Sequence, residues 1–343
     1  MATTYSAWLA VRKGEPAEAV QLKSDLPVPT TIPKNHVLVK VLATALNPVG
    51  YKLLRSMPNF VMGRPHPMEQ DFAGVVADAN GTDFKVGDRV FGASPSPKNG
   101  TLAEYTIIPA DVLATIPPNI SAVDASGLAT VMLTAVQALK DLKLEKGQTV
   151  FINGGSSAVG WSAIQLAKAK GYRVVATASG KNKELLLGLG VDEFIDYTES
   201  PLAERLKSTP PSPQFNGILD AVGLTDPALY LNCAKYLAPG GRYLTAGTLP
   251  HSGAEWAGLI RQVLEGLLRP SWLGGVPRKF GAVAVKFKKQ DLDDIRQLVA
   301  DGSVKPIVDS VYTFDRDGVM RAYERLMTKR AVGKVVVKVA DEQ

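Results

Sequence analysis

The segment at residues 149–177 constrains the fold most strongly. An apolar run at 149–153 is followed by a turn rich in glycine and serine, by helically spaced apolar residues at 158–170 and by a second apolar run at 173–177. Short apolar runs bounded by turn residues predict buried strands, and the spacing between them predicts a helix. The sequence therefore predicts a strand–helix–strand unit with parallel strands.

The same alternation continues toward the C-terminus. Further strands are expected at residues 193–196, 217–220 and 241–245, each separated from the previous one by a helical or turn segment. This order predicts a parallel sheet covered by helices on both faces, which is a Rossmann-type doubly wound α/β domain. After an apolar run, we expect helices at residues 291–300 and 317–327 and a last strand at 333–339.

The N-terminal part, residues 5–120, has a different pattern. Its short β-like runs are broken by turn residues, which predicts a compact β-rich domain. These runs include residues 37–42, 74–77 and 105–108. Two prolines then interrupt the chain, and Ser121 starts an apolar pattern that reaches Leu142. This pattern predicts one N-capped helix.

The turn after the first central strand matches a dinucleotide-binding fingerprint. Residues 153–160 read Asn-Gly-Gly-Ser-Ser-Ala-Val-Gly, with a serine in place of the middle glycine. Such a turn brings backbone N–H groups at a helix N-terminus against a pyrophosphate and needs small residues there. We therefore expect Ser156, Ser157, Ala158 and Val159 to bind a dinucleotide cofactor. The alternative is a plain strand-to-helix turn.

The end of the second central strand indicates which cofactor binds. An NAD-binding domain carries Asp or Glu there to hold the ribose hydroxyls. Residues 177–183 read Thr-Ala-Ser-Gly-Lys-Asn-Lys, and the first carboxylate after them is Glu184. Ser179 offers a hydroxyl, and Lys181 and Lys183 would neutralise a 2′-phosphate. We expect NADPH rather than NADH, although either lysine could be an ordinary solvated residue at a helix start.

The sequence does not favour a metal site. It contains one cysteine and three histidines, whereas structural zinc lobes need four cysteines. The histidines, His36, His66 and His251, have no ligand-like spacing, and we expect Cys233 to lie on a helix and to pack in the protein core. We therefore expect a zinc-free protein, without a Lewis acid to stabilise an alkoxide. A single cysteine also excludes an internal disulfide, which fits a reducing compartment.

Composition is that of an ordinary globular protein, with 45% hydrophobic and 21% charged residues and a net charge of +6. The densest basic clusters, residues 286–289 and 325–330, are short and adjoin apolar periodic segments. A solvated face explains them better than a nucleic-acid partner. Because neither a signal peptide nor a membrane-spanning run is recognised, we expect a cytoplasmic protein without a membrane partner.

Several short motifs together resemble a known family. They lie at residues 46–49, 70–76, 85–90, 102–105, 165–168, 219–223 and 333–336. In this order, and with the glycine-rich turn, they resemble the zinc-free quinone oxidoreductase branch of the medium-chain dehydrogenase/reductases. They also resemble the fungal trans-acting enoyl reductases. The resemblance covers nearly the whole chain.

The resemblance implies how the chain is divided and where the cofactor binds. It implies a GroES-like substrate domain at residues 1–123, completed by 289–343, and an NADP-binding Rossmann domain at 124–288, with the nicotinamide in the cleft between them. Many relatives are homodimers, and the trans-acting enoyl reductases are monomers. The positions that match the family's 2′-phosphate pocket are Ser179, Lys183 and Tyr197. The other matched cofactor positions are Asn47, Gly247, Gly333 and Lys334.

Two positions decide how far the family's chemistry carries over. A zinc-ligand histidine of related enzymes would fall at Gln70, which supports the absence of zinc. An acidic residue follows Asn-Pro-Val in many relatives, whereas Gly50 stands there in this chain. The substrate pocket is therefore expected to differ. We expect Tyr51 or Lys52 to donate a proton or hydrogen bond near the nicotinamide; the alternatives are a proton from bulk water and a solvent-facing loop position for Lys52.

Three functions stay open at this point. The first is a stand-alone NADPH-dependent reductase of quinones or of the activated C=C of α,β-unsaturated carbonyls. The second is an enoyl reductase that acts in trans on a carrier-bound polyketide intermediate. The third is a non-enzymatic NADPH- or RNA-binding protein, which the basic charge permits. An apolar helical face expected at residues 256–268 would line the substrate cleft, cover a partner surface or pack in the core.

Overall fold

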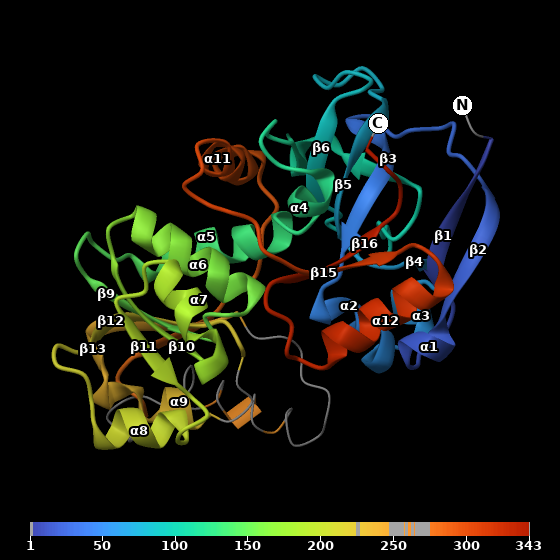
Figure 1. Ribbon diagram of the computed structural model, residues 1–343. Coiled ribbons are helices and arrows are strands. Elements are labelled where there is room, and N and C mark those ends of the chain that lie inside the picture. The colour runs from blue at the N-terminus through green and yellow to red at the C-terminus, as the bar shows by residue number, and fades with distance from the viewer. Residues whose placement is uncertain are drawn as a thin grey trace. The chain divides into compact units, whose positions relative to one another are not determined.

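The computed structural model describes residues 3–223, 227–246 and 275–342, with the single positions 257, 260, 261 and 264 (Figure 1). The chain forms two compact units. One, which we call the β-rich unit, consists of Met1–Leu133 and Lys286–Gln343, and the other, the α/β unit, is Thr134–Val285.

The α/β unit is built on a six-stranded parallel sheet. Its strands are β9 (Thr149–Asn153), β10 (Arg173–Ala178), β11 (Glu193–Asp196), β12 (Phe215–Asp220), β13 (Leu237–Thr245) and β14 (Lys279–Ala282). Their order in the sheet is β11-β10-β9-β12-β13-β14, and every pair is parallel. This is the doubly wound order of a Rossmann fold, so the predicted fold of this part is confirmed. All of β9 is buried, as expected for a strand covered on both faces.

Short helices connect these strands. They are α6 (Ala158–Ala169), α7 (Lys183–Gly188), α8 (Leu202–Ser208), α9 (Ala228–Leu231) and the 3-10 turns η2 (Gly180–Asn182) and η3 (Cys233–Lys235). Cys233 lies in a 3-10 turn and is fully buried among apolar and aromatic side chains, which confirms its packing role. Burial raises the pKa of its thiol to about 12, so the thiol stays protonated and unreactive.

The β-rich unit contains two sheets. The strands of the smaller sheet are β2 (Val20–Pro27), β1 (Thr4–Ala10) and β4 (His66–Pro67), in that order. The larger sheet runs β15 (Val308–Thr313), β16 (Lys334–Lys338), β3 (His36–Ala45), β5 (Asp71–Asp78), β6 (Arg89–Ala93) and β8 (Leu113–Thr115), with β7 (Tyr105–Pro109) also paired to β3. Because β16 pairs with β3, the C-terminal segment completes the N-terminal sheet (Figure 1).

The helices of this unit correct one prediction. They are α1 (Pro16–Ala19), α2 (Pro48–Ser56), α3 (Asn59–Met62), η1 (Ala110–Val112), α4 (Ala122–Ser126), α11 (Lys289–Ala300) and α12 (Arg316–Met327), and α5 (Ala129–Leu142) begins in it. Ser121 and Asp124 form the capping box of α4. The expectation of a single helix up to Leu142 is wrong, because α4 ends before Gly127. Gly127 is the C-cap of α4, and a Cβ there would lie 2.7 Å from Cγ of Lys334, so the position between the two helices favours glycine.

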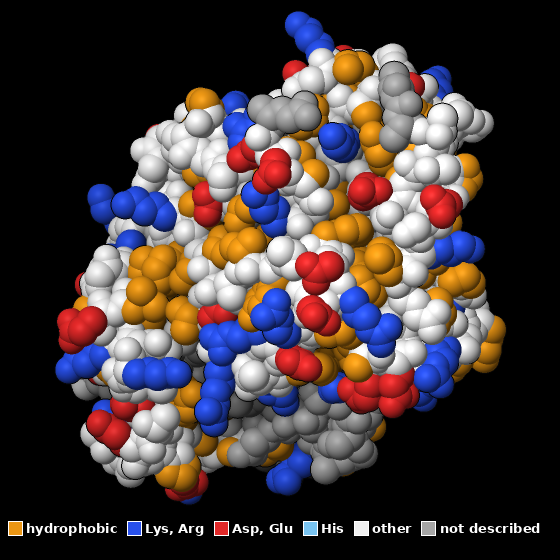
Figure 2. Space-filling view, turned by 45° about the vertical axis from the view of Figure 1, so that its right-hand side comes forward, with side chains coloured by type: hydrophobic (Ala, Val, Ile, Leu, Met, Phe, Trp, Pro, Cys, Tyr) orange, Lys and Arg blue, Asp and Glu red, His pale blue; other side chains and the backbone are white. Residues whose placement is uncertain are grey.

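The surface carries mixed charge. Figure 2 shows Lys and Arg side chains interleaved with Asp and Glu over the visible face. Exposed ion pairs such as Arg173–Glu193 and Lys168–Asp192, at 2.9 and 2.7 Å, contribute at most about 1 kcal/mol each. Within the described part of the chain, every helix is too short or too polar to cross a membrane.

Candidate cofactor and catalytic site

The turn after β9 is held by hydrogen bonds to Thr177 on β10. The N–H of Gly154 donates to Oγ1 of Thr177 at 2.9 Å, and the N–H of Gly155 donates to the carbonyl of Thr177 at 2.7 Å. Gly154 has a φ of +80°, in the left-handed region that glycine adopts without strain. The turn is therefore held against the end of β10.

Helix α6 begins directly after this turn and could receive an anion. Ser157 is its N-cap, and its Oγ accepts a hydrogen bond from the N–H of Gly160 at 3.1 Å. The N–H groups of the first helical turn, which includes Ala158 and Val159, have no carbonyl partner within the helix. A Cβ on Gly160 would lie 2.2 Å from the carbonyl oxygen of Gly154, so the helix approaches the turn as closely as backbones allow. The small residues of the turn and the N–H groups at the N-terminus of α6 fit a pyrophosphate.

A buried polar network underlies the turn, and no local sequence pattern indicates it. Asn153 donates through Nδ2 to Oδ1 of Asp220 at 2.8 Å and accepts from Oγ1 of Thr177 at 2.7 Å. The hydroxyl of Tyr243 donates to Oδ2 of Asp220 at 3.1 Å. Burial, with Asp220 next to it, raises the pKa of Tyr243 well above its usual value. The network joins four neighbouring strands at their carboxyl ends, where ligands of open α/β sheets bind.

The three residues expected around a 2′-phosphate lie at the ends of two adjacent strands. Ser179 follows β10 and is half-buried, whereas Lys183, at the start of α7, is exposed. Tyr197 follows β11 and is also exposed, and its N–H donates to the carbonyl of Ala178 at 3.3 Å. Ser179, Lys183 and Tyr197 therefore follow the carboxyl ends of two neighbouring strands, at one corner of the sheet.

An acidic residue, Asp196, adjoins this corner. It accepts hydrogen bonds from the N–H and Oγ1 of Thr198, at 2.8 and 2.6 Å, and these bonds hold its pKa below the usual range. A Cβ on Gly180 would lie 2.4 Å from Oδ2 of Asp196. The sequence pattern after β10 contained no carboxylate at this place, because Asp196 comes from the neighbouring strand.

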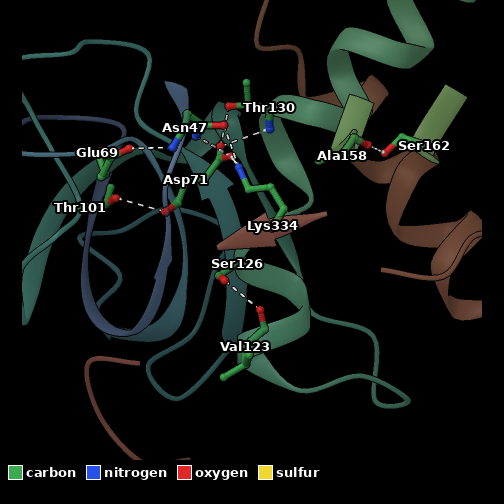
Figure 3. A network of polar contacts seen from close by, with 10 residues as sticks. All are labelled: Asn47, Glu69, Asp71, Thr101, Val123, Ser126, Thr130, Ala158, Ser162 and Lys334. Atoms are coloured by element: carbon green, nitrogen blue, oxygen red, sulfur yellow. Dashed lines mark hydrogen bonds and ion pairs between the residues drawn. The ribbon is translucent and has the colours of Figure 1, made fainter. Parts of the chain in front are cut away.

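In the β-rich unit, four elements contribute to a buried polar cluster (Figure 3). Nζ of Lys334 donates to Oδ1 of Asn47 at 2.7 Å and to Oδ2 of Asp71 at 3.0 Å. Asn47 donates through Nδ2 to Asp71 at 3.0 Å, and Thr130 donates to the other oxygen of Asp71. We call these residues the Asp71 cluster. Because Asp71 and Lys334 are at most 4% exposed, this is a buried ion pair in which each charge compensates the other.

A second carboxyl group, Glu69, adjoins the Asp71 cluster. Its Oε2 accepts from the N–H of Asn47 and its Oε1 from the hydroxyl of Tyr323, both at 3.0 Å. Burial is the main reason that the pKa of Glu69 is raised to about 7. A Cβ on Gly50 would lie 2.5 Å from Oε1 of Glu69. The departure at Gly50 therefore has a structural reason, since its missing side chain leaves room for this carboxyl.

Replacing Glu69 should change how stability depends on pH. Since the folded pKa of about 7 exceeds the usual 4.5, the unfolded chain releases this proton first as pH rises. The group therefore lowers the free energy of unfolding between pH 4.5 and 7. We expect the free energy of unfolding of Glu69→Gln, measured by urea denaturation, to rise relative to that of the wild type by roughly 2–3 kcal/mol between pH 5 and pH 8. A difference between the two proteins that stays constant with pH would contradict this assignment.

Comparisons with known proteins place the chain. Residues 33–118 match the alcohol dehydrogenase GroES-like domain, and residues 189–337 match the zinc-binding dehydrogenase family. Trans-enoyl reductase pgmF of Aspergillus terreus is 35% identical over 353 residues, which cover 98% of this chain and 97% of that protein. The chain belongs to the medium-chain dehydrogenase/reductase superfamily. The expected resemblance is thereby confirmed.

Two further relatives of this superfamily match over their whole length. Trans-enoyl reductase poxH of Penicillium oxalicum is 31% identical over 386 residues and is covered to 99%, as is this chain. The structure of the quinone oxidoreductase from Coxiella burnetii has a TM-score of 0.81 at 26% identity, covering 98% of this chain and 99% of that one. The chain is therefore an oxidoreductase with a nicotinamide cofactor, and its β-rich unit contains a GroES-like domain.

Both expected catalytic residues of this superfamily member lie on α2 and are buried. Lys52 is 7% exposed, so its interpretation as a solvent-facing loop residue is wrong. Tyr51 is 2% exposed and belongs to an apolar cluster with Trp8 and Leu54. The guanidinium of Arg55 lies 5.0 Å from the centre of its ring, in a cation–π contact. These contacts show that the Tyr51 ring packs in the core of the β-rich unit.

Gln70 and Gly333 lie among the described residues, whereas Gly247 and His251 do not. Gln70, at the family's zinc-ligand position, donates its amide to the carbonyl of Ser94 at 2.9 Å. The described ranges contain no group of three or more His, Cys, Asp or Glu side chains that could hold a metal ion. Gly333 has a φ of +97° and directly precedes Lys334. Gly247 and His251 lie outside the described residues, as does most of the apolar face expected at 256–268.

Proposed function

We propose that the chain is an NADPH-dependent reductase that reduces the activated C=C of an α,β-unsaturated carbonyl, or a quinone, without zinc. The observation that carries this proposal is the fit of the turn at residues 154–160 to a dinucleotide, next to Ser179 and Lys183. The printed names of the relatives, which are enoyl reductases and a quinone oxidoreductase, support the reaction class.

The proposed cofactor contacts divide by chemistry. Ser156, Ser157 and the first-turn N–H groups of Ala158 and Val159 would hold the pyrophosphate. The hydroxyl of Ser179, the ammonium of Lys183 and the hydroxyl of Tyr197 would hold the 2′-phosphate. We propose the α/β unit, Thr134–Val285, as the NADP-binding domain, in place of the expected bounds 124–288, with Gly247 as a further contact.

Residues of the β-rich unit would serve the nicotinamide end. We propose Asn47, Gly333 and Lys334 as its contacts, because the buried Asp71 cluster holds Asn47 and Lys334 in fixed orientations. The bound cofactor supplies the hydride. Lys52 would donate a proton or stabilise the developing enolate or quinol anion by its charge. This stabilisation takes the place of a Lewis acid, which is consistent with Gln70 at the family's zinc-ligand position.

A carrier-bound substrate is the second candidate. The similarity to two trans-enoyl reductases over nearly the whole chain favours it. The experiment that separates the two compares free enones and quinones with the same enone attached to an acyl carrier protein, with NADPH as donor. Turnover of the free acceptors supports a stand-alone reductase, whereas turnover of the attached enone alone supports the carrier-bound reaction. Turnover of neither, with NADPH binding absent, contradicts both.

Cofactor choice gives a separate prediction. Ser179→Asp places a carboxylate where the 2′-phosphate would bind and adds to the negative charge of Asp196. We expect the preference for NADPH over NADH, measured as the ratio of kcat/KM, to fall about 10- to 100-fold, the effect of losing a hydrogen bond to a charged group. Ser208→Asp, on the exposed end of α8, is the matched control and should leave the ratio unchanged. An unchanged ratio in Ser179→Asp would contradict the proposal that the 2′-phosphate binds next to Ser179.

A further inference from the structure

A small cavity in the β-rich unit adjoins Glu69. It measures about 20 Å³, which is room for one water molecule. Its polar lining includes Glu69, His66, Arg64 and Gln70, and its apolar lining comes mainly from α2 and α3. The cavity therefore gives a buried carboxyl group access to a water molecule and to an imidazole ring.

The imidazole of His66 presents an acceptor. Its Nδ1 lies 2.9 Å from the carbonyl of Pro67, a contact that requires Nδ1 to carry the proton. Burial lowers the pKa of His66, so the ring is neutral and Nε2 has a lone pair. Among the described residues, no group hydrogen-bonds to Nε2, although the residue is only 7% exposed. A buried acceptor of this kind calls for a donor, which a water can supply.

Glu69 also adopts a costly backbone conformation. Its φ of +61° lies in the left-handed region, where a residue other than glycine, Asn or Asp is uncommon. Such conformations persist where the surrounding structure determines them, and they gather at functional sites. The conformation directs the carboxyl group to the N–H of Asn47 and the hydroxyl of Tyr323, next to the space left by Gly50. The backbone conformation, two hydrogen bonds and the absence of a side chain at Gly50 thus all accommodate the carboxyl group of Glu69.

We propose that Glu69 is a positioning residue whose proton, exchanged through a water in this cavity, sets the net charge of Glu69 and the Asp71 cluster together and thereby the relative affinity for NADP⁺ and NADPH. This inference rests on the proposed function, in which Asn47 and Lys334 contact the nicotinamide. When Glu69 is protonated, its O–H donates to the water and the water donates to His66. The charges of Asp71 and Lys334 then cancel. When Glu69 is ionised, Glu69 and the Asp71 cluster together carry one net negative charge.

The sign of the effect follows from the cofactor's charge. The nicotinamide ring is positive in NADP⁺ and neutral in NADPH, and the two forms are otherwise alike. An ionised Glu69 therefore favours NADP⁺. Burial raises the pKa of Glu69, the N–H of Asn47, the hydroxyl of Tyr323 on α12 and Lys334 on β16 lower it, and Asp71 on β5 raises it. His66 and Arg64 line the same cavity. A pKa of about 7 places the change within the range in which the enzyme would work.

The test measures the dissociation constants of NADP⁺ and NADPH by calorimetry between pH 5.5 and pH 8.5. Titration of the 2′-phosphate affects both cofactors alike and cancels in their ratio. We expect Kd(NADPH)/Kd(NADP⁺) of the wild type to rise by on the order of tenfold through pH 7, as one charge acting at an effective dielectric constant of ~20 would cause. In Glu69→Gln the ratio should stay at its low-pH value. Glu324→Gln, an exposed carboxyl on α12, is the matched control and should behave as wild type.

Two further variants should move the midpoint in opposite directions. Tyr323→Phe removes a hydrogen bond that favours the carboxylate, so the midpoint should shift to higher pH. His66→Phe removes the acceptor that favours the protonated form, so the midpoint should shift to lower pH. A general loss of structure would not produce shifts of opposite sign. A wild-type ratio independent of pH, or the same pH dependence in Glu69→Gln, would overturn the inference and leave the proposed function intact. If neither cofactor bound, the result would contradict the proposed function itself, on which this inference rests.

Discussion

Lys334→Met should lower the free energy of unfolding by about 3–5 kcal/mol, measured by urea denaturation at pH 7. The reason is the burial of Asp71, which is fully inaccessible to solvent. Without Lys334, its charge retains hydrogen bonds from Asn47 and Thr130 but has no opposite charge within the cluster. Removing one partner of a buried ion pair costs far more than removing the pair.

The same strand provides the control. Lys338 on β16 pairs with Asp341 at the surface, where their side chains are 46% and 87% exposed. Lys338→Met should therefore change stability by at most about 1 kcal/mol. The double variant Lys334→Met with Asp71→Asn should recover part of the loss, because no unpaired charge stays buried. Equal effects of the two single lysine variants would mean that the Asp71 cluster does not hold the charges as described.

Lys52→Met should lower kcat by about 10²- to 10⁴-fold, the usual contribution of a positioned proton donor. The affinity for NADPH should change little, because Lys52 is not among the proposed cofactor contacts. Tyr51→Phe is the companion variant, and its packing among apolar side chains predicts a small effect on kcat. Stopped-flow measurement of a single turnover would separate the chemical step from product release. Full activity of Lys52→Met would instead assign the proton to bulk water.

The periodic parts of this fold were predictable because each is encoded locally. The strand and helix limits around the turn at residues 154–160 follow from apolar runs and small residues. The break at Gly127 was not predicted, although a glycine inside a helical pattern can mark a helix end. The side chain that favours glycine there belongs to Lys334, which is distant in sequence and adjacent in space. Helical periodicity continues through that glycine, so the pattern alone predicts one helix.

The candidate site was predictable only in part for the same reason. Asn47 and Lys334 were identified by family resemblance, yet the bond between them spans 287 positions and the bond from Tyr323 to Glu69 spans 254. No local pattern indicates such pairs. Asp196 was missed because strand pairing, rather than sequence distance, brings it to Gly180. Gly50 showed that the pocket differs from that of relatives, but only the structure relates it to Glu69.

The most direct test of the proposed function is NADPH consumption, followed by the loss of reduced-nicotinamide absorbance, with a panel of quinones and α,β-unsaturated carbonyls. NADH and a metal chelator are the controls, because they test the cofactor assignment and the absence of zinc together. We predict turnover with NADPH, weak turnover with NADH and no effect of the chelator. Equal use of NADH, or loss of activity with the chelator, would contradict the proposal of a zinc-free NADPH-dependent reductase.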